Sequence, residues 1–505
     1  MKTTDKKRLA KNTLFLYIRM FVIMAISLIT SRIVLKTLGE VDFGIYNIVG
    51  GIVVLFSFLN AAMATSTQRF LSFALGKNNL DEVQRVFSMS VTTYFILLLI
   101  IVFLSETLGL WFLNTQMNIP NERMTAANWV YQFSIFTFCM NMIRVPYNAS
   151  IVAYEKMNFY AYTSIIESAL KLIIVYLLYI STYDKLIIYG LLTLCVVSSI
   201  TLIYTIFCYN KISTCRYSFF FDKNLFNKII SFSGWSLFGS FANLTSQQGL
   251  GILLNIFWGV VVNAAVGIAN QITSAIYQFV SNFQLAFNPQ IIKTYAANEK
   301  YQFQQLVYQS SKYSFFLLMI IAIPAILNID FILNLWLDKV PQYTSEFVII
   351  ILIYLSIDAM SAPLWLSAQA KGNIKKYQIS ISCILLLNLP FAYIALKLGF
   401  SPISVWCTRL FVNILSFIYR CYYAQKNIGL SMILFYRKVI LKVVPTLIIS
   451  FMIPYFISEI THEWIKLIST TIITLFISGL SIYFLGTEKN ERNVILKFIK
   501  QKISL

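Results

Sequence analysis

Apolar segments long enough to cross a bilayer recur along the whole chain, and this recurrence limits the possible folds more than any other feature. A hydrocarbon core of about 30 Å is spanned by roughly 20 helical residues. Hydrophobic residues make up 58% of the 505 residues and charged residues only 12%, with a mean hydropathy of +0.72. Soluble domains are roughly 25% charged. The sequence therefore predicts an all-α integral membrane protein without a sizeable soluble domain.

These segments predict about fourteen transmembrane helices. Their expected ranges are 13–36, 43–64, 86–108, 127–150, 158–181, 185–208, 229–257, 262–287, 309–330, 344–368, 376–397, 401–424, 437–458 and 464–486. The segment 229–257 is the most polar, because it contains the run SGWSLFGSFANLTSQQG. Since a polar helix does not face lipid on every side, we expect one face of this helix to meet water or substrate.

The distribution of basic residues predicts the orientation in the membrane. If the N-terminus is cytoplasmic, the inside segments hold 29 Lys and Arg residues, against six in the outside loops. This asymmetry follows the positive-inside rule and places both termini in the cytoplasm. The first apolar run follows MKTTDKKRLAK and is too long for a cleavable signal peptide, so we expect a cytoplasmic anchor. Because the basic charge is explained by topology, nucleic acid is not an expected partner.

Motifs for catalysis, nucleotide binding and metal binding are missing from the sequence. It contains no GxxxxGK(S/T), GxGxxG or GxSxG pattern. The one histidine, His462, and the seven cysteines show no CxxC or CxxH spacing. We therefore expect no metal, no cofactor and no enzymatic activity, and the chain supplies no ATPase of its own.

Three pairs of segments match one another in the same order, at offsets of 217 to 222 positions. LGEVDFGIYNIVGGI matches WGVVVNAAVGIANQI, 64–88 matches 286–310, and 144–162 matches 361–379. The aligned residues include Gly39 with Gly259, Gln68 with Gln290, and Pro146 with Pro363. Because an even number of helices separates the copies, the repeats are parallel.

This internal repeat predicts two parallel six-helix bundles around a central cavity. The bundles are expected at 1–208 and 229–424, joined by a cytoplasmic linker at 209–228. Residues 425–505 add two helices and a basic cytoplasmic tail. Such a pair of bundles is typical of transporters that work by alternating access.

Several features together indicate a family. They are the arrangement of six plus six plus two helices, the LG…FG turn after the first helix, the basic inside segments and the run PYNASIVAYEKM at 146–157. On these features the chain resembles, over essentially its whole length, the polysaccharide flippases of the Wzx type. Their superfamily includes multidrug and toxic-compound extrusion pumps and the lipid II flippase.

The resemblance implies a bacterial inner-membrane protein that flips an undecaprenyl-pyrophosphate-linked oligosaccharide for lipopolysaccharide, O-antigen or capsule synthesis. It implies as partners this lipid-linked oligosaccharide, membrane lipids, a polysaccharide polymerase and glycosyltransferases.

Arginines inside apolar segments are the candidate substrate ligands, since each costs about 2.5–3.5 kcal/mol at a helix centre. Arg19 and Arg144 lie near the predicted inner ends of their helices, and Arg32 and Arg409 toward the outer ends. Because Arg stays protonated, burial requires an anion or water. A cationic cavity suits a pyrophosphate, which guanidinium groups bind bidentately. The alternative is that the side chains reach the headgroups without binding substrate.

Acidic side chains in the spans are few. Glu167 lies four residues before Lys171, which predicts an i,i+4 pair. Asp358 lies midway along 344–368 and is a candidate partner of Arg409. The Glu167–Lys171 pair is either structural or part of a proton relay, and Glu167 and Asp358 are the candidates for ion coupling.

Two other functions compete with the flippase. One is a cation-coupled (H⁺ or Na⁺) multidrug extrusion antiporter, which requires buried carboxylates and aromatic residues. The other is a polysaccharide polymerase or glycosyltransferase. The short outside loops disfavour the second, because sugar chemistry usually needs a large extramembrane region.

Overall fold

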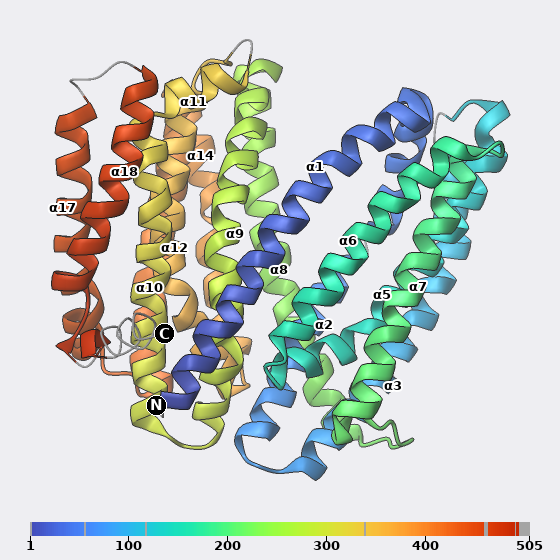
Figure 1. Cartoon of the computed structure of the whole chain (residues 1–505), viewed down its shortest axis with the longest axis horizontal. Helices are drawn as coiled ribbons and strands as arrows, with labels where there is room; N and C mark the ends of the chain where they lie inside the picture. Colours follow the sequence, from blue (N-terminus) through green and yellow to red (C-terminus); the bar gives the residue numbers. More distant parts are fainter. Residues whose placement is uncertain are drawn as a thin grey trace, which may run out of the picture. The chain divides into compact units, whose positions relative to one another are not determined.

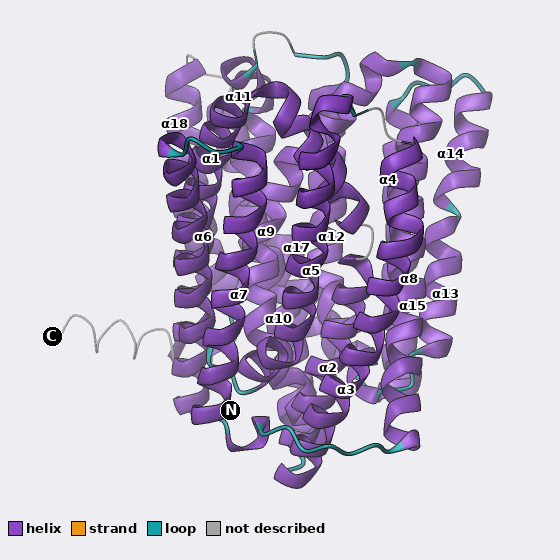
Figure 2. Ribbon diagram, turned by 90° about the vertical axis from the view of Figure 1, so that its right-hand side faces the viewer, coloured by secondary structure: helices purple, strands orange, loops and turns teal. Residues whose placement is uncertain are grey.

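The computed structural model describes residues 3–54, 57–116, 119–337, 340–458, 463–489 and 491–493 (Figure 1). Their regular structure is helical, and no strand occurs in these ranges (Figure 2). The α-helices are α1 (Thr3–Val54), α2 (Ser57–Gly76), α3 (Leu80–Leu104), α4 (Leu110–Gln116), α5 (Met124–Ala153), α6 (Met157–Ile180), α7 (Lys185–Lys211), α8 (Lys223–Trp258), α9 (Val260–Ala296), α10 (Lys300–Leu327), α11 (Ile329–Trp336), α12 (Thr344–Lys371), α13 (Lys375–Leu386), α14 (Asn388–Lys397), α15 (Ile403–Tyr423), α16 (Met432–Phe435), α17 (Leu441–Ser458) and α18 (Glu463–Ser481). Short π or 3₁₀ turns lie at Ser105–Gly109, Asn121–Arg123, Ser213–Cys215, Ala424–Ile428, Tyr436–Ile440 and Ile482–Gly486.

The predicted all-α membrane architecture is confirmed. Each expected span is helical over nearly all of its described residues. In the described part of the chain, eight helical stretches are long and apolar enough to cross a membrane: Leu80–Thr115, Met157–Ile180, Lys185–Lys211, Lys300–Leu327, Thr344–Lys371, Lys375–Lys397, Met432–Phe456 and Glu463–Gly486. α8 is outside this set and carries the Gly-, Ser- and Gln-rich run, yet it continues for 36 residues.

α1 consists of two helices that meet at Gly39. This glycine has φ 80° and ψ 170°, a backbone conformation that is essentially restricted to glycine. A straight helix of 52 residues would measure about 78 Å, more than twice the hydrocarbon thickness. Before the kink, Phe15 packs edge-on against Tyr162 of α6, and after it Tyr46 packs against Tyr189 of α7. The kink therefore separates the first two predicted spans.

The segments that match in sequence also match in backbone conformation. A residue with positive φ occurs at equivalent turns, 217 or 220 positions apart. At the turn after α2 the offset is 220, so the structural match of 64–88 is shifted by two residues from the offset of 222 predicted from the sequence. The pairs are Gly39 and Gly259 (80° and 76°), Asn78 and Asn298 (56° and 58°), and Glu155 and Gly372 (59° and 92°). Equivalent helices thus end in equivalent turns, as expected of a repeat.

The chain divides into two compact units. Unit 1 comprises Met1–Ser240 and Ile292–Glu299, and unit 2 comprises Phe241–Ile291 and Lys300–Leu505. The end of α9 belongs to unit 1, where Lys293 Nζ lies 2.6 Å from Glu155 Oε1. In unit 2, α17 and α18 pack on each other and on α10 (Figure 1). The bundle boundaries predicted from the sequence stay predictions.

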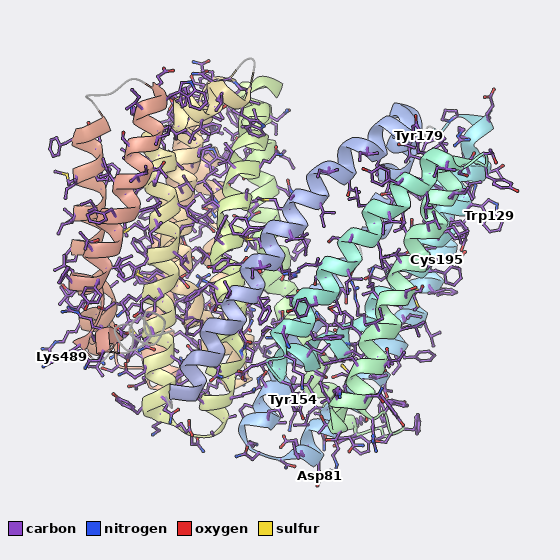
Figure 3. The ribbon with its side chains drawn as sticks, viewed as in Figure 1. Asp81, Trp129, Tyr154, Tyr179, Cys195 and Lys489 are labelled. Carbon is purple, nitrogen blue, oxygen red and sulfur yellow. The ribbon has the colours of Figure 1, made fainter. Side chains whose placement is uncertain are left out.

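Unit 1 exposes aromatic side chains at one end. Tyr179 and Trp129 are exposed at the end opposite Asp81 and Tyr154 (Figure 3). Tyrosine and tryptophan concentrate at membrane interfaces, where a ring contacts lipid and a polar group contacts water. These positions are consistent with an interface at that end.

Candidate functional site

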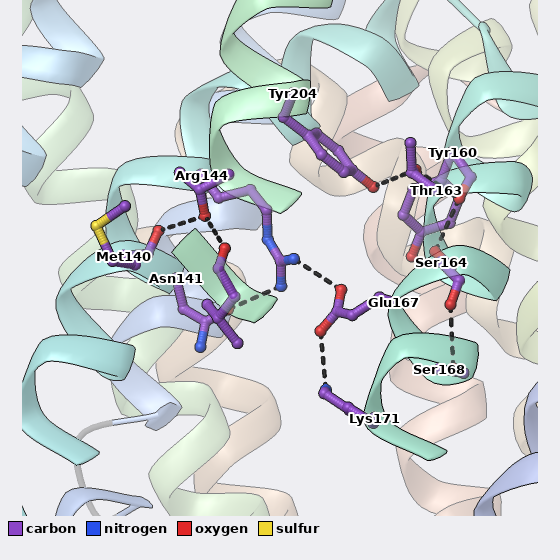
Figure 4. A network of polar contacts seen from close by, with 12 residues as sticks. Met140, Asn141, Arg144, Tyr160, Thr163, Ser164, Glu167, Ser168, Lys171 and Tyr204 are labelled. Carbon is purple, nitrogen blue, oxygen red and sulfur yellow. Dashed lines mark hydrogen bonds and ion pairs between the residues drawn. The ribbon is translucent and has the colours of Figure 1, made fainter. Parts of the chain in front are cut away.

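A cluster of polar side chains joins α5 and α6 in unit 1 (Figure 4). Arg144 donates from Nη1 to Glu167 Oε2 at 2.8 Å and from Nη2 to Asn141 Oδ1 at 2.8 Å. Lys171 Nζ donates to the other oxygen, Glu167 Oε1, at 2.8 Å. Asn141 and Arg144 are three positions apart and Glu167 and Lys171 four, so each pair lies on one face of its helix. The expected Glu167–Lys171 pair forms, and Arg144 joins it from the neighbouring helix.

This cluster carries more positive than negative charge, because one carboxylate serves two cations. Lys171 lies on the face of α6 roughly opposite to the exposed apolar residues Ile166 and Ile173. The Lys171 side chain nevertheless remains 43% exposed, whereas that of Glu167 is 17% exposed. The cluster is therefore not fully enclosed by protein, because the Lys171 side chain stays partly exposed.

Two tyrosines extend the cluster toward α1. The ring of Tyr204 on α7 lies 5.6 Å from Arg144 Cζ, and its hydroxyl is hydrogen-bonded to Thr163 at 3.1 Å. Arg19 Cζ lies 4.4 Å over the ring of Tyr160, which Figure 4 shows beside Tyr204. Arg19 Nε is buried without a hydrogen-bond partner among the described residues. A cation–π contact is worth only about 0.5–2 kcal/mol, so Arg19 keeps donor capacity for an anion.

The other two predicted arginines do not lie in this cluster. Arg32 is helical within α1, but its side chain lies outside the described side chains, so its predicted role stays a prediction. Arg409 belongs to unit 2 and is buried, with Cζ 4.6 Å from the ring of Tyr354 and 5.2 Å from that of Trp406. The Arg409 guanidinium thus lies against two aromatic rings.

A second polar cluster lies in unit 2, around Asp358 on α12. Arg420 on α15 donates from Nη1 to Asp358 Oδ1 at 3.1 Å and also to Ser361 Oγ. The hydroxyl of Tyr277 on α9 donates to Asp358 Oδ2 at 3.4 Å. Asp358 is therefore held by groups from two neighbouring helices.

The structure pairs Asp358 with Arg420 in place of the predicted candidate Arg409, and depth along the helices explains the difference. α12 and α15 start at the same level, because Phe347 contacts Trp406 with ring centroids 5.7 Å apart. At 1.5 Å per residue, Asp358 lies about 21 Å along α12. Arg420 lies about 26 Å along α15, whereas Arg409 lies only about 9 Å along it.

Three buried or largely buried cations were missed from the sequence because they were counted with the cytoplasmic basic residues. They are Arg69 on α2 and Lys312 on α10, both buried, and Arg420 on α15, whose side chain is 12% exposed. Arg69 Cζ lies 4.6 Å from the rings of Phe70 and Phe73. A signal existed for Arg420. It follows Arg409 by eleven positions, about three helical turns, so both lie on one face of α15.

Arg123, expected in an outside loop, forms an ion cluster at an end of unit 1. Its guanidinium lies 2.6 Å from Asp42 Oδ2 and 2.5 Å from Asp184 Oδ2. Asp184 also accepts hydrogen bonds from the first backbone N–H groups of α7. Burial raises the pKa of Asp184, but the bonds from Arg123 and the α7 backbone outweigh it and bring the pKa below its ordinary value. The cluster links the helix that follows the Gly39 kink to α7.

Comparison with known families yields two matches. The model of the family described as "Polysaccharide biosynthesis protein" matches residues 9–294, which is more than half of the chain. The MatE family model matches residues 236–394. No curated protein matches the chain in sequence.

Several solved structures are similar in fold. A MATE protein in the bent conformation is 14% identical, with 84% of this chain and 96% of that chain covered and a TM-score of 0.71. An outward-facing multidrug resistance MATE family transporter of the MOP superfamily is 14% identical, with 85% and 98% covered and a TM-score of 0.70. A MOP superfamily transporter from Pyrococcus furiosus, described as having a binding pocket of reverse polarity, is 14% identical, with 83% and 96% covered and a TM-score of 0.67. These likenesses show that the chain has the MATE transporter fold.

Proposed function

Since this chain belongs to the family of polysaccharide biosynthesis proteins, we propose that it is a flippase for an undecaprenyl-pyrophosphate-linked oligosaccharide. It acts in the bacterial inner membrane, with both termini cytoplasmic, by alternating access. Pyrophosphate and sugar hydroxyls cannot enter hydrocarbon without a large desolvation penalty. A polar path through the protein removes that barrier and delivers the repeat unit for lipopolysaccharide or capsule synthesis. No covalent chemistry is required.

The observation that carries the proposal is the charge balance of the α5–α6 cluster. Arg144 and Lys171 supply two positive charges, and Glu167 supplies the one carboxylate that bonds both of them. Arg19 of α1 adds a further positive charge beside Tyr160 of α6. A pyrophosphate linking a lipid to a sugar carries two negative charges and several acceptor oxygens. Arginine forks bind such oxygens in pairs, and lysine adds a point charge. The excess of cations suits this ligand better than an organic cation.

Glu167 has a defined role in this proposal, as an internal competitor of the substrate. Its two carboxylate oxygens occupy the Nη1 of Arg144 and the Nζ of Lys171, which are donors that a pyrophosphate would use. When phosphate oxygens replace it, Glu167 remains a partly buried charge without a partner, which is unfavourable. Return of Glu167 to Arg144 and Lys171 then favours release of the substrate on the other side.

The test is flipping of a fluorescent lipid-pyrophosphate oligosaccharide in proteoliposomes. Arg144→Gln and Arg19→Gln are expected to lower the flipping rate at least about tenfold, because each removes a charge-assisted contact worth about 1.5–3 kcal/mol. Lys77→Gln, which removes an exposed cation from the turn after α2, serves as the matched control and should match the parent. A parent protein that moves no such lipid would contradict the proposal.

A cation-coupled multidrug antiporter is the second candidate, favoured by the MatE match over 236–394, which includes Asp358. A carboxylate beside tyrosines is suited to an organic cation. The ion pair with Arg420 weighs against it, since the carboxylate is already neutralised. If this function is correct, Asp358→Asn abolishes exchange of organic cations for H⁺ or Na⁺, and Arg144→Gln leaves that exchange intact.

A further inference from the structure

The segment between α7 and α8, residues 212–222, runs along α3 instead of into solvent; we call it the strap. Gln84 Nε2 donates to the Arg216 carbonyl at 3.3 Å, and the Ser218 backbone N–H donates to Ser88 Oγ at 3.2 Å. The hydroxyl of Tyr217 lies 3.3 Å from that of Thr92. Because 84, 88 and 92 are four positions apart, the strap follows one face of α3 over two turns.

The strap reaches the level at which α3 begins to expose apolar side chains. Apart from Leu80 at the first position of α3, the exposed large apolar side chains of this fully described helix begin at Phe95 and continue with Leu99 and Phe103. Thr92, the contact of Tyr217, precedes Phe95 by three residues, or about 4.5 Å. Tyr217 therefore lies at the boundary between headgroups and hydrocarbon in the predicted membrane.

Aromatic side chains of the strap are exposed, although Tyr217 also contacts Thr92 and the ring of Phe221 lies 5.5 Å from that of Phe226. Phe219 is 85% exposed, Phe221 53% and Tyr217 48%. Three exposed rings within five residues are unfavourable in water, whereas the membrane interface favours aromatic side chains. The end of unit 1 that holds the strap is the one marked by Tyr154 in Figure 3, since Tyr154 is hydrogen-bonded to Thr214 at 2.9 Å.

Basic side chains flank these rings. Lys211, Arg216 and Lys223 are exposed, and the exposed Arg85 of α3 lies with Cζ 5.5 Å from the ring of Phe220. The acid within the strap is Asp222, whose Oδ1 accepts the first N–H groups of α8 at 2.8 and 3.2 Å. Asp81 and Glu82 lie in the first turn of α3, farther from the apolar series than Arg85. The surface facing the lipid thus combines apolar rings with net positive charge.

We propose that the strap is an interfacial anchor that binds anionic phospholipid of the cytoplasmic leaflet. Phe219 and Phe221 insert among the upper acyl carbons, and Arg85, Arg216 and Lys223 bind headgroup phosphates. Anionic lipid supplies the charge that these cations lack, and the attraction adds to the partition of the rings. The strap joins the last helix of the first repeat to the first helix of the second, so the lipid contact fixes that junction in depth. This site is independent of the substrate cluster.

Photo-crosslinking in liposomes tests the depth of the strap. The full chain carries p-benzoyl-phenylalanine at position 219 or, as a control, at position 78, an exposed turn residue between α2 and α3. The liposomes contain equal amounts of phosphatidylcholine and phosphatidylglycerol, and adducts are identified by mass spectrometry. We expect lipid adducts at 219 at least about tenfold more often than at 78. Equal yields at the two positions, or none at 219, would overturn the proposal.

The preference for anionic lipid is tested with the same probe. Phosphatidylglycerol adducts should exceed phosphatidylcholine adducts, and Arg85→Gln with Arg216→Gln should reduce this excess about fivefold for each charge removed. Replacement of both arginines by lysine should preserve the excess of phosphatidylglycerol adducts. This result would show that the positive charge, and not the shape of the arginine side chain, gives the preference. If the excess of phosphatidylglycerol adducts is unchanged in the Gln variant, or absent from the parent, the proposed preference for anionic lipid is wrong. Gel-filtration behaviour like that of the parent establishes that each variant is folded.

Discussion

Asn141 and Asp358 occupy equivalent positions in the two repeats, 217 residues apart, and each accepts a hydrogen bond from an arginine Nη group. Arg144 donates to Asn141 at 2.8 Å, and Arg420 donates to Asp358 at 3.1 Å. In the first repeat the acceptor is a neutral amide, so Arg144 keeps its charge for Glu167 or for a ligand. In the second repeat the acceptor is a carboxylate, which neutralises Arg420. The same position therefore serves two different electrostatic purposes.

This difference predicts the effect of Asn141→Asp. A second carboxylate beside Arg144 should neutralise the cation excess of the cluster and weaken binding of a soluble pyrophosphate-sugar headgroup at least about tenfold. Isothermal titration of the purified protein measures the affinity. Asn141→Gln keeps a neutral amide and is the matched control. An affinity that Asn141→Asp leaves unchanged would place the headgroup elsewhere.

Glu167→Gln should have the opposite effect on affinity. Without its internal competitor, the Arg144–Lys171 pair should bind the headgroup about tenfold more tightly, because two charge-assisted bonds no longer have to be exchanged. The flipping rate should fall, since release is no longer assisted. Titration and the liposome assay together check this split. Weaker binding in the Gln variant would show that Glu167 positions Arg144 instead of competing for it.

Lys312 and Glu491 provide a stability prediction in unit 2. Their Nζ and Oε2 atoms lie 2.7 Å apart, and their side chains are only 2% and 8% exposed. Lys312→Met should lower the free energy of unfolding by about 3–5 kcal/mol, because it leaves the Glu491 charge buried and unpaired. Adding Glu491→Leu should recover most of the loss. Unfolding in mixed micelles measures both.

The more exposed pair of Lys438 and Glu488, 3.3 Å apart, is the control for that experiment. Lys438→Gln removes this ion pair and should change the free energy of unfolding by at most about 1 kcal/mol. Equal effects of the two lysine substitutions would contradict the assignment of the large effect to burial.

Alanine substitutions at the kink glycines test the backbone of the repeat. Gly39→Ala and Gly259→Ala should each lower the free energy of unfolding by about 1–3 kcal/mol, since both residues have strongly positive φ. No neighbouring atom lies within 4 Å of a Cβ added at either position, so the effect reports strain and not a clash. Gly251→Ala, at an equally open position inside α8, should stabilise the helix by about 0.5–1 kcal/mol.

The Arg123–Asp184 contact predicts a pH dependence. The folded pKa of Asp184 lies below its ordinary value, so its contribution to stability is present above about pH 4 and is lost as the pH falls through the folded pKa. The melting temperature of Asp184→Asn should therefore lie below that of the parent at pH 7. The gap should narrow below about pH 4. A gap that stays constant down to pH 3 would show that the charge of Asp184 does not contribute.

The fold was largely predictable from the sequence because apolar run length and charge asymmetry are local properties. The Glu167–Lys171 pair was predictable for the same reason, since helical spacing alone places the two residues together. Contacts between helices were not. Arg144 reaches Glu167, and Arg420 reaches Asp358, only through the depth at which neighbouring helices pack. A one-turn shift of α15 would change which arginine is nearest, and nothing in the sequence of α15 itself encodes that shift.

The kink at Gly39 also affects the sidedness of every later segment. In the predicted orientation, the chain crosses outward before Gly39 and returns inward after it. If α1 continued straight, residues 40–54 would leave the bilayer, and each subsequent span would cross in the opposite direction. Most of the 29 basic residues expected inside would then have to pass through the membrane. The backbone conformation of this one glycine therefore determines on which side of the membrane the later loops must be placed during insertion.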